Sequence, residues 1–456
     1  MTTVTLTAAA APERAGKRAT SFYRAVWRWH FYAGLLTLPF LILLAVTGGL
    51  YLFRGELDGL IHRDVKRVEA RAAAPRPPSE LVARALQALP GKAVKYMPPE
   101  TATNSAEVTI LGTDGAKTVV YVDPYDARVL GQIADRGTAM WIVRQLHSLG
   151  YFGPVAKGVI EIVGGWAILL VLSGLYLWWP RRQGGGIVTV RGKPRQRVFW
   201  RDLHAVTGLL AGGFILFLAV TGMPWSVLWG AKVNQWANGH NFGYPAGVRV
   251  AVPMSDEHLA HGGPTTWSLE QARLPRSMSA GTGPIGLDAA VAPLDRLGLT
   301  RGYAVNLPSG PRGVYTGSVY PKDLALQRVI HLDQYSGKPL LDMSYADYGP
   351  LGKALEWGIN VHMGQEFGLA NQLVMLAACC GTVLLCVSAV VMWWKRRPAG
   401  SLGTPPLPAD RRSLVIVFAI LAVGGVVFPL VGASLIAMAL IDWLAHRNAQ
   451  PERALT

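Results

Sequence analysis

An internal repeat constrains the fold of this chain more than any other feature. His30, Gly34, Thr47 and Gly48 recur as His204, Gly208, Thr221 and Gly222 with one constant offset and no gap. A second stretch repeats in the same way, so that His147, Gly153, Ser173 and Trp178 correspond to His362, Gly368, Ser388 and Trp393. Each stretch contains an apolar run, which predicts a duplicated pair of helices. Four of the ten histidines fall at equivalent positions of this repeat.

Composition places the chain among integral membrane proteins. Apolar residues make up 51% of the sequence and charged residues only 16%, a balance typical of membrane-spanning chains. The formal net charge is +16. We interpret it as an orientation signal and a surface for membrane lipid, because no basic run carries the features of a nucleic-acid reader. No nucleic acid is expected as a partner.

Five apolar stretches are long enough to cross a bilayer as helices. We expect a cytoplasmic tail (1–28), five spans (29–53, 147–179, 204–229, 357–394 and 413–445), two outer segments (54–146 and 230–356), two basic cytoplasmic loops (180–203 and 395–412) and a C-terminal tail (446–456). The basic loops orient the chain with its N-terminus in the cytoplasm. Pro429 is expected to kink the fifth span.

The two outer segments share a pattern of one helix followed by strands. The expected elements are a helix at 79–88 with strands at 106–111 and 118–122, and a helix at 286–297 with strands at 302–307, 313–319 and up to residue 331. Both segments close on one spacing, Asp123 and Tyr125 against Asp333 and Tyr335. A Gly/Pro-rich insert, 238–285, is expected to be a loop. The predicted fold class is a membrane all-α bundle of about five helices, with two small α+β modules on the outer side.

The four repeated histidines are the candidate functional residues. In this topology His30 and His204 lie at the cytoplasmic ends of their spans, and His147 and His362 lie on the outer side. A lone histidine near an interface is more often a hydrogen-bonded packing residue than a ligand. Haem iron held between two imidazoles on each side explains the number, pairing and symmetry of all four. A zinc site would need three or four close ligands, and no such motif is present.

Several other residues are weaker candidates. His62 is a possible extra ligand or substrate contact, and Glu161 is either a proton relay or half of an ion pair with Lys157. Four arginines near the two faces (Arg28, Arg54, Arg144 and Arg201) are expected either to pair with haem propionates or to act as positive-inside signal and solvated residues. The remaining histidines (His240, His258, His261, His331 and His446) are interpreted as solvated. His147 and His362 lie farther from the tryptophans at the other ends of their spans than one crossing requires, so the outer haem is expected near the interface.

The motifs resemble those of a known family. Trp-Arg-Trp-His at 27–30, Leu-His-Ser-Leu at 146–149, Asp-Leu-His-Ala-Val-Thr-Gly at 202–208 and Val-His-Met-Gly at 361–364 are similar to the PepSY-associated transmembrane helix family. This family includes iron-regulated inner-membrane proteins and siderophore-iron reductases of Gram-negative bacteria. The resemblance covers roughly residues 20–395. The two outer modules resemble PepSY domains, most clearly at residues 122–130.

The resemblance implies a bacterial inner-membrane oxidoreductase with two b-type haems. Its axial ligands would be His30, His147, His204 and His362, and it would carry electrons outward to reduce a periplasmic ferric siderophore or another ferric chelate. No Gly-x-Gly-x-x-Gly unit follows the last span, so the electron donor is expected to be quinol or a separate cytoplasmic reductase. Aromatic residues proposed to contact the chelate are Trp236, Tyr244, Trp267, Tyr303 and Tyr315.

Two alternatives remain open at this point. One is a permease-like or regulatory membrane protein whose PepSY modules bind a peptide or a partner. The other is a quinol-linked cytochrome with a different electron acceptor.

Overall fold

The residues form two compact units. The computed structural model describes residues 11–179, 187–240, 242–245, 275–278, 283–398, 403, 405 and 410–448. The helical unit comprises Met1–Val46, Ser148–Trp229 and Leu376–Thr456, and the sheet-containing unit comprises Thr47–His147 and Gly230–Met375. Within the described residues, four helices are long and apolar enough to cross a membrane, namely Ser21–Tyr51, Gly150–Trp178, Arg197–Trp225 and Gly368–Arg396.

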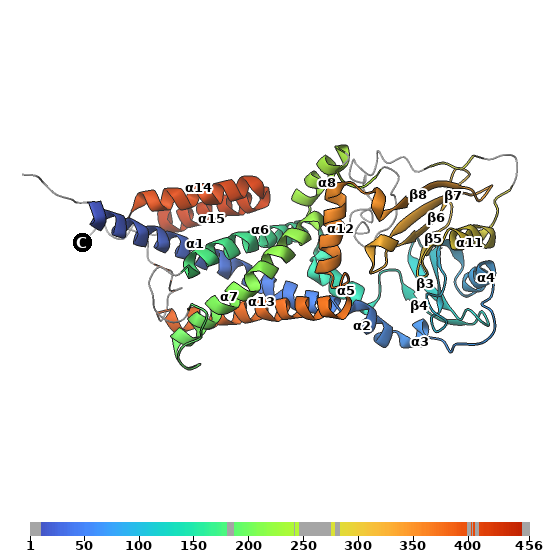
Figure 1. Ribbon diagram of the computed structural model, residues 1–456, viewed down its shortest axis with the longest axis horizontal. Helices are drawn as coiled ribbons and strands as arrows, with labels where there is room; N and C mark the ends of the chain where they lie inside the picture. The colour runs from blue at the N-terminus through green and yellow to red at the C-terminus, as the bar shows by residue number, and fades with distance from the viewer. Residues whose placement is uncertain are drawn as a thin grey trace, which may run out of the picture. The chain divides into compact units, whose positions relative to one another are not determined.

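The helical unit is built from long apolar helices (Figure 1). They are α1 (Ala11–Tyr51), α6 (Gly153–Trp178), α7 (Arg197–Gly222), α13 (Gly368–Arg396), α14 (Arg411–Val427) and α15 (Pro429–Asn448). Buried residues from α1, α6, α14 and α15 share one core in which Trp166 is the largest side chain. The small residues Ala25 and Ala33 of α1 allow the neighbouring helices to approach closely.

The segment before the first span is helical. α1 begins at Ala11, within the stretch 1–28 that was predicted to be a cytoplasmic tail. Pro12 stands in the first turn, where its missing N–H costs nothing, and the segment that follows is rich in alanine and arginine, which favour helix.

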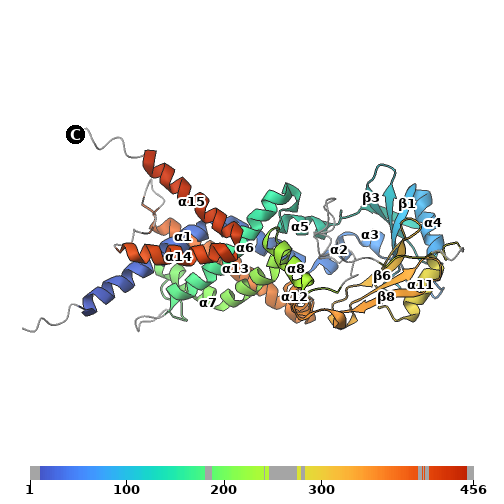
Figure 2. The ribbon, with the colours of Figure 1, turned by 90° about the horizontal axis from the view of Figure 1, so that it is seen from above.

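The prediction of a single fifth span is wrong. The chain forms two helices, α14 and α15, that meet at one end and both run back from it (Figures 1 and 2). Phe428 between them is extended (φ −120°, ψ 87°), and Pro429 starts a new helix instead of kinking the old one. A Cβ on Gly425 would lie 2.7 Å from the Cα of Gly432, so the hairpin needs glycine there.

Two of the predicted spans are interrupted at their histidines. His147 is the last residue of α5 (Ala139–His147) and His362 is the last residue of α12 (Pro350–His362). The chain turns through the short η1 helix (Gly150–Phe152) before α6, and through Gly364 and Gly368 at positive φ before α13. These breaks explain why 147–179 and 357–394 are too long for one crossing each.

The sheet-containing unit holds one eight-stranded antiparallel sheet with the order β4-β3-β2-β1-β5-β6-β7-β8. The strands are β1 (Gly91–Met97), β2 (Ala106–Gly112), β3 (Lys117–Val122), β4 (Val129–Ala134), β5 (Ala304–Asn306), β6 (Val314–Val319), β7 (Arg328–Asp333) and β8 (Pro339–Ser344). Strands β1, β4 and β8 were not predicted. The two expected modules are therefore halves of a single sheet, joined where Lys95 and Tyr96 of β1 pair with Asn306 and Val305 of β5.

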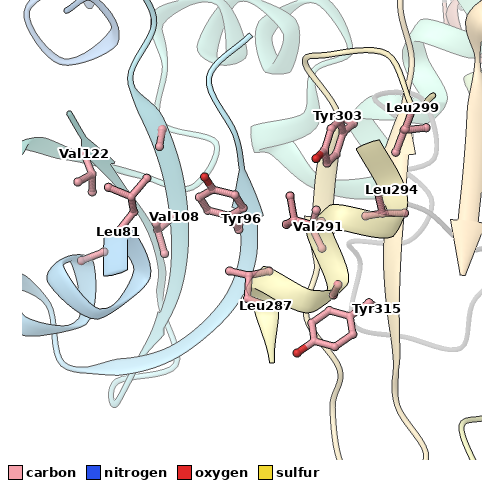
Figure 3. Packing of buried hydrophobic residues seen from close by; sticks show 14 of the residues in the cluster. Leu81, Tyr96, Val108, Val122, Leu287, Val291, Leu294, Leu299, Tyr303 and Tyr315 are labelled. Carbon is pink, nitrogen blue, oxygen red and sulfur yellow. The ribbon is translucent and has the colours of Figure 1, made fainter. Parts of the chain in front are cut away.

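Helices α4 (Pro78–Ala88) and α11 (Leu287–Arg296) pack on one face of this sheet. Figure 3 shows their apolar residues interleaved with those of the strands, including Leu81, Tyr96 and Leu294. The backbone N–H of Ser79 in α4 donates to the Asp288 carboxylate in α11 at 2.8 Å, which ties the two helices together.

The predicted spacing at the end of each half forms the same turn twice. The carboxylate of Asp123 accepts from the backbone N–H of Tyr125 at 2.9 Å, and that of Asp333 accepts from the N–H of Tyr335 at 3.0 Å. Shorter elements complete the unit: α2 (Arg54–Ile61), α3 (Arg63–Lys66), α8 (Trp229–Gly239), η3 (Leu324–Leu326) and η4 (Tyr345–Asp347). Most of the insert at 238–285 lies outside the described residues.

Candidate functional site

The first candidate site lies in the helical unit, where two repeated histidines come together. His30 belongs to α1 and His204 to α7. Their imidazoles are close enough to interact electrostatically. The structure thus brings together the two histidines that the sequence analysis assigned to the cytoplasmic side.

A serine determines which nitrogen of His30 carries the proton. The hydroxyl of Ser173 donates to the carbonyl oxygen of Leu169 at 2.7 Å and lies 2.9 Å from Nδ1 of His30. A hydroxyl has only one proton to donate. Ser173 therefore accepts the Nδ1–H of His30, and Nε2 keeps the lone pair.

The second copy of the repeat reproduces this arrangement. Nδ1 of His204 lies 3.0 Å from Oγ of Ser388 and 3.1 Å from the carbonyl oxygen of Leu385. Because a carbonyl oxygen can only accept, Nδ1 of His204 also carries its proton. Both imidazoles then offer Nε2, with the other nitrogen fixed by a hydrogen bond, which is the usual state of a histidine metal ligand.

Glycine occupies the position one turn after each of these histidines. Gly34 follows His30 by one turn of α1, and Gly208 follows His204 by one turn of α7, so each shares a helix face with its histidine. A Cβ would meet only Leu170 at 4.0 Å in the first case and only Leu385 at 3.6 Å in the second. The two contacts are equivalent in the repeat, and neither is a clash. These glycines therefore keep the helix surface one turn from each histidine free of a side chain.

The second candidate site lies in the sheet-containing unit. Nδ1 of His147 is 2.9 Å from the hydroxyl oxygen of Thr47. Burial and the neighbouring His147 lower the pKa of His362 to about 3. His362 is therefore neutral at physiological pH and lies within electrostatic reach of His147. The structure brings these two histidines together as well.

Buried amides hold the chain around His362. The side-chain amide of Asn371 donates to the carbonyl oxygen of Val361 at 3.0 Å, directly before His362. The amide of Gln372 donates to the carbonyl oxygen of Leu52 at 2.9 Å. Both amides are buried, so the break between α12 and α13 is a fixed structure.

A buried carboxyl group lies on the same helix as His362. Glu356 of α12 is only 4% exposed, and it is hydrogen bonded to the hydroxyl of Tyr244. Its Oε1 has no hydrogen-bond partner among the described residues. Burial raises its pKa to about 7. Glu356 could not be identified from the sequence, since a single glutamate in an amphipathic helix carries no distinguishing pattern.

Two weaker candidates have structural roles. The carboxylate of Glu161 accepts from the backbone N–H groups of Leu228 at 2.8 Å and Trp229 at 3.0 Å, so it caps the start of α8. Nε2 of His62 accepts from the N–H of Ala139 at 3.2 Å, at the start of the helix that ends in His147. Both side chains thus hold the backbone at the start of a helix.

The four arginines divide into two groups. On the helical unit, Arg28 donates to the carbonyl oxygen of Pro405 at 2.6 Å, and Arg201 pairs with Asp202 at 2.8 Å. Both guanidinium groups therefore already have hydrogen-bond or ion-pair partners. Arg54 and Arg144 both lie in the sheet-containing unit and interact with each other electrostatically.

Several of the remaining histidines and of the aromatic residues proposed to contact the chelate are more buried than the sequence predicted. His331 is fully buried in β7 and bonds Thr316 at 2.8 Å, so its assignment as a solvated residue is wrong. Tyr303 and Tyr315 are buried in the core of the sheet-containing unit and cannot contact a docked chelate. Tyr244 lies inside with Glu356, whereas Trp236 is exposed. Outside the described residues lie His258, His261, Trp267 and the side chain of His446.

Within the described residues, no cluster of three or more histidine, cysteine, aspartate or glutamate side chains could hold a metal ion. A zinc site therefore has no candidate in this part of the chain. Pairs of imidazoles remain, which is the ligand set of a haem iron. The hydroxyl partners Ser173 and Ser388 were visible in the sequence as repeat markers, but their contact with the histidines could not be assigned without the packing of the helices.

The repeated helix pairs and the four equivalent histidines define a multi-pass membrane protein with internal duplication. The family model of the PepSY-associated TM region matches residues 27–396. The chain therefore belongs to this family. A comparison with curated proteins finds no match.

Proposed function

We propose that this protein is a transmembrane electron carrier that holds two b-type haems and reduces a ferric chelate, such as a ferric siderophore, on the outer side of a bacterial inner membrane. The observation that carries the proposal is the pairing of His30 with His204 and of His147 with His362. Each pair supplies the two imidazoles that a six-coordinate haem iron requires.

The residues at the first pair fit this cofactor. The hydrogen bonds of Ser173 and Ser388 fix both imidazoles with Nε2 available, and Gly34 and Gly208 keep the helix surface beside them free of a side chain. An iron ligand needs the unprotonated nitrogen, and a flat macrocycle needs space between the helices. When bound, haem would supply the one-electron chemistry. The protein would bind it, orient it and exclude water from it.

The second pair would be the exit point for electrons. Thr47 and the buried amides of Asn371 and Gln372 fix the segments that carry His147 and His362. The sheet-containing unit would provide the docking surface for the chelate, with its two halves acting as PepSY-like modules. Reduction to ferrous iron weakens a chelate made for ferric iron, so one electron suffices for release.

The proposed orientation rests on the basic segments of the helical unit. The Lys395 ammonium donates to the carbonyl oxygen of Arg195 at 3.0 Å, which supports placing both basic loops on one side of the membrane. The positive-inside rule then assigns that side, and the N-terminus, to the cytoplasm. Quinol or a separate cytoplasmic reductase would donate the electrons there.

The visible spectrum of the purified protein tests the proposal. The detergent-solubilised protein is compared before and after dithionite reduction, with haem quantified per chain. We expect two low-spin b haems. His30→Ala and His362→Ala should each lose one haem, while the control His240→Ala, at an exposed residue just after α8 whose Nδ1 lies 2.8 Å from the carbonyl oxygen of Trp236, should keep both. Wild-type protein that contains no haem when haem is supplied would refute the proposal.

Ferric-chelate reduction tests the second part of the function. The protein is placed in vesicles with a reductant on its cytoplasmic side. Ferrous iron that forms on the other side is trapped and measured. We expect the rate to fall at least tenfold in His362→Ala. Full activity in both His147→Ala and His362→Ala would exclude this route for electrons.

A further inference from the structure

A buried acid lies on the helix that ends in His362. Glu356 precedes His362 by six residues of α12, which places their Cα atoms about 10 Å apart. Glu356 is buried, as are Asn360 and Val361 between the two residues. A change of charge at His362 would therefore act on Glu356 through the interior of the protein, where salt and solvent screen it little.

The hydrogen bonds of Glu356 differ from those of the other buried glutamate. Both carboxylate oxygens of Glu161 accept a backbone N–H, at 2.8 and 3.0 Å. Glu356 is hydrogen bonded to the hydroxyl of Tyr244, and among the described residues its Oε1 has no partner. A buried carboxylate with so few donors costs free energy, whereas the neutral acid is tolerated. Glu356 can therefore change its charge without breaking a network of hydrogen bonds.

The groups that face this carboxyl are tyrosines. Tyr244, Tyr345 and Tyr348 each interact electrostatically with Glu356, and Tyr320 interacts with Tyr244 in turn. The ring centroid of Tyr348 lies 5.3 Å from that of Tyr244 and 5.8 Å from that of Tyr345. In the described part of the chain, no arginine, lysine or histidine lies within ion-pair distance of Glu356. The Tyr244 hydroxyl can donate to the carboxylate or accept from the neutral acid, so it suits both protonation states.

We infer that Glu356 is a proton-binding site coupled to the redox state of the second histidine pair. Given the proposed function, Glu356 takes up one proton from the outer side when the haem between His147 and His362 gains an electron from quinol or a reductase. It releases the proton when that electron passes to the ferric chelate. Charge balances in both steps, because iron changes between ferric and ferrous as the carboxylate changes to a neutral acid and back. Tyr244 is a positioning residue for this proton.

The size of the coupling follows from the distance. At about 12 Å and an effective dielectric constant of about 20, one elementary charge changes the proton affinity of a carboxyl group about tenfold. The coupling is reciprocal, so protonation of Glu356 changes the electron affinity of the haem by the same factor. A tenfold change corresponds to about 59 mV for a one-electron couple. Because burial raises the pKa of Glu356 to about 7, the change falls near neutral pH.

The test is a redox titration of the haem at the second pair as a function of pH. It uses the full-length His30→Ala protein, which isolates this haem. We expect the midpoint potential to be about 59 mV lower at about pH 9 than at about pH 5, because the carboxylate disfavours the added electron. Glu356→Gln should keep the low-pH potential of its parent throughout. Tyr244→Phe should move the fall to higher pH, because it removes the donor that stabilises the carboxylate.

A control variant and a second readout separate this effect from a structural one. Glu80→Gln, in the first turn of α4, should titrate like its parent. Infrared difference spectra, reduced minus oxidised and recorded near neutral pH, should contain the C=O band of a newly protonated carboxyl group. This band should be absent in Glu356→Gln. A pH-dependent potential that persists unchanged in Glu356→Gln would overturn the inference.

The failures of the two ideas are distinguishable. Wild-type protein that takes up no haem refutes the proposed function and, with it, this inference. Haem uptake with a potential that does not depend on pH overturns the inference alone. If Glu356→Gln does not fold, Tyr244→Phe decides, and a fall of the potential at the parent's pH would again overturn the inference.

Discussion

The buried carboxyl group of Glu356 makes a strong prediction about stability and pH. Its folded-state pKa is about 7, against 4.5 for an ordinary glutamate, because burial disfavours the ionised form. The hydroxyl of Tyr244 is hydrogen bonded to it, but no described residue pairs with Oε1. The folded protein therefore binds a proton at this site that the unfolded chain has released.

The direction of the pH effect on stability follows from this difference in proton binding. A raised pKa contributes stability that is fully present below about pH 4.5 and is lost as the pH rises to about 7. The interval corresponds to roughly 3 kcal/mol, at about 1.4 kcal/mol for each pH unit. For a unit of this size, that is a change in melting temperature of roughly 6 to 12 °C.

Glu356→Gln removes the ionisable group and keeps its shape. We expect the variant to match the wild-type melting temperature near pH 5 and to exceed it progressively up to pH 8. The assay is thermal unfolding of the purified protein followed by intrinsic fluorescence at four pH values. Glu80→Gln, a change at a half-buried glutamate in the first turn of α4, is the matched control and should give curves parallel to those of the wild type. A plot of melting temperature against pH for Glu356→Gln that runs parallel to that of the wild type would refute the reasoning.

Three further changes test the candidate site. Ser173→Ala removes the acceptor for Nδ1–H of His30 and should weaken haem binding at the first pair by 10- to 100-fold and raise its midpoint potential in a redox titration. Gly208→Leu should abolish haem binding there by placing a side chain beside His204. The control Gly213→Leu, where a Cβ meets nothing within 4 Å, should retain haem. Equal visible spectra of the two variants would contradict this. His62→Ala removes the cap of α5 and should lower the unfolding free energy by about 1 kcal/mol, measurable by denaturant titration.

The duplicated helices and the histidine pairs could be predicted because both leave a periodic trace in the sequence. A constant offset between His30 and His204 means that the two residues occupy equivalent places in equivalent helices, and the positive-inside rule then sorts them by side. The turns at Asp123 and Asp333 were visible for the same reason. Local spacing is sufficient where a feature is repeated without gaps.

Other features depend on contacts that spacing does not encode. The hairpin at Pro429 and a kinked span have the same apolar pattern, and the close approach of Gly425 to Gly432 distinguishes them only in three dimensions. The hydroxyl of Ser173 is one of many in apolar helices until α1 is packed against α6. The fusion of two modules into one sheet rests on a short pairing of β1 with β5.

This β1–β5 seam makes the sheet-containing unit a covalent counterpart of a symmetric dimer. Each half alone would end in an unpaired strand, β1 or β5, and would lack the contact between α4 and α11 at Ser79 and Asp288. A chain with a single half would expose this edge, which is suited to pair with the identical strand of a second copy. With both halves in one chain the same contact is intramolecular, so its formation does not depend on protein concentration.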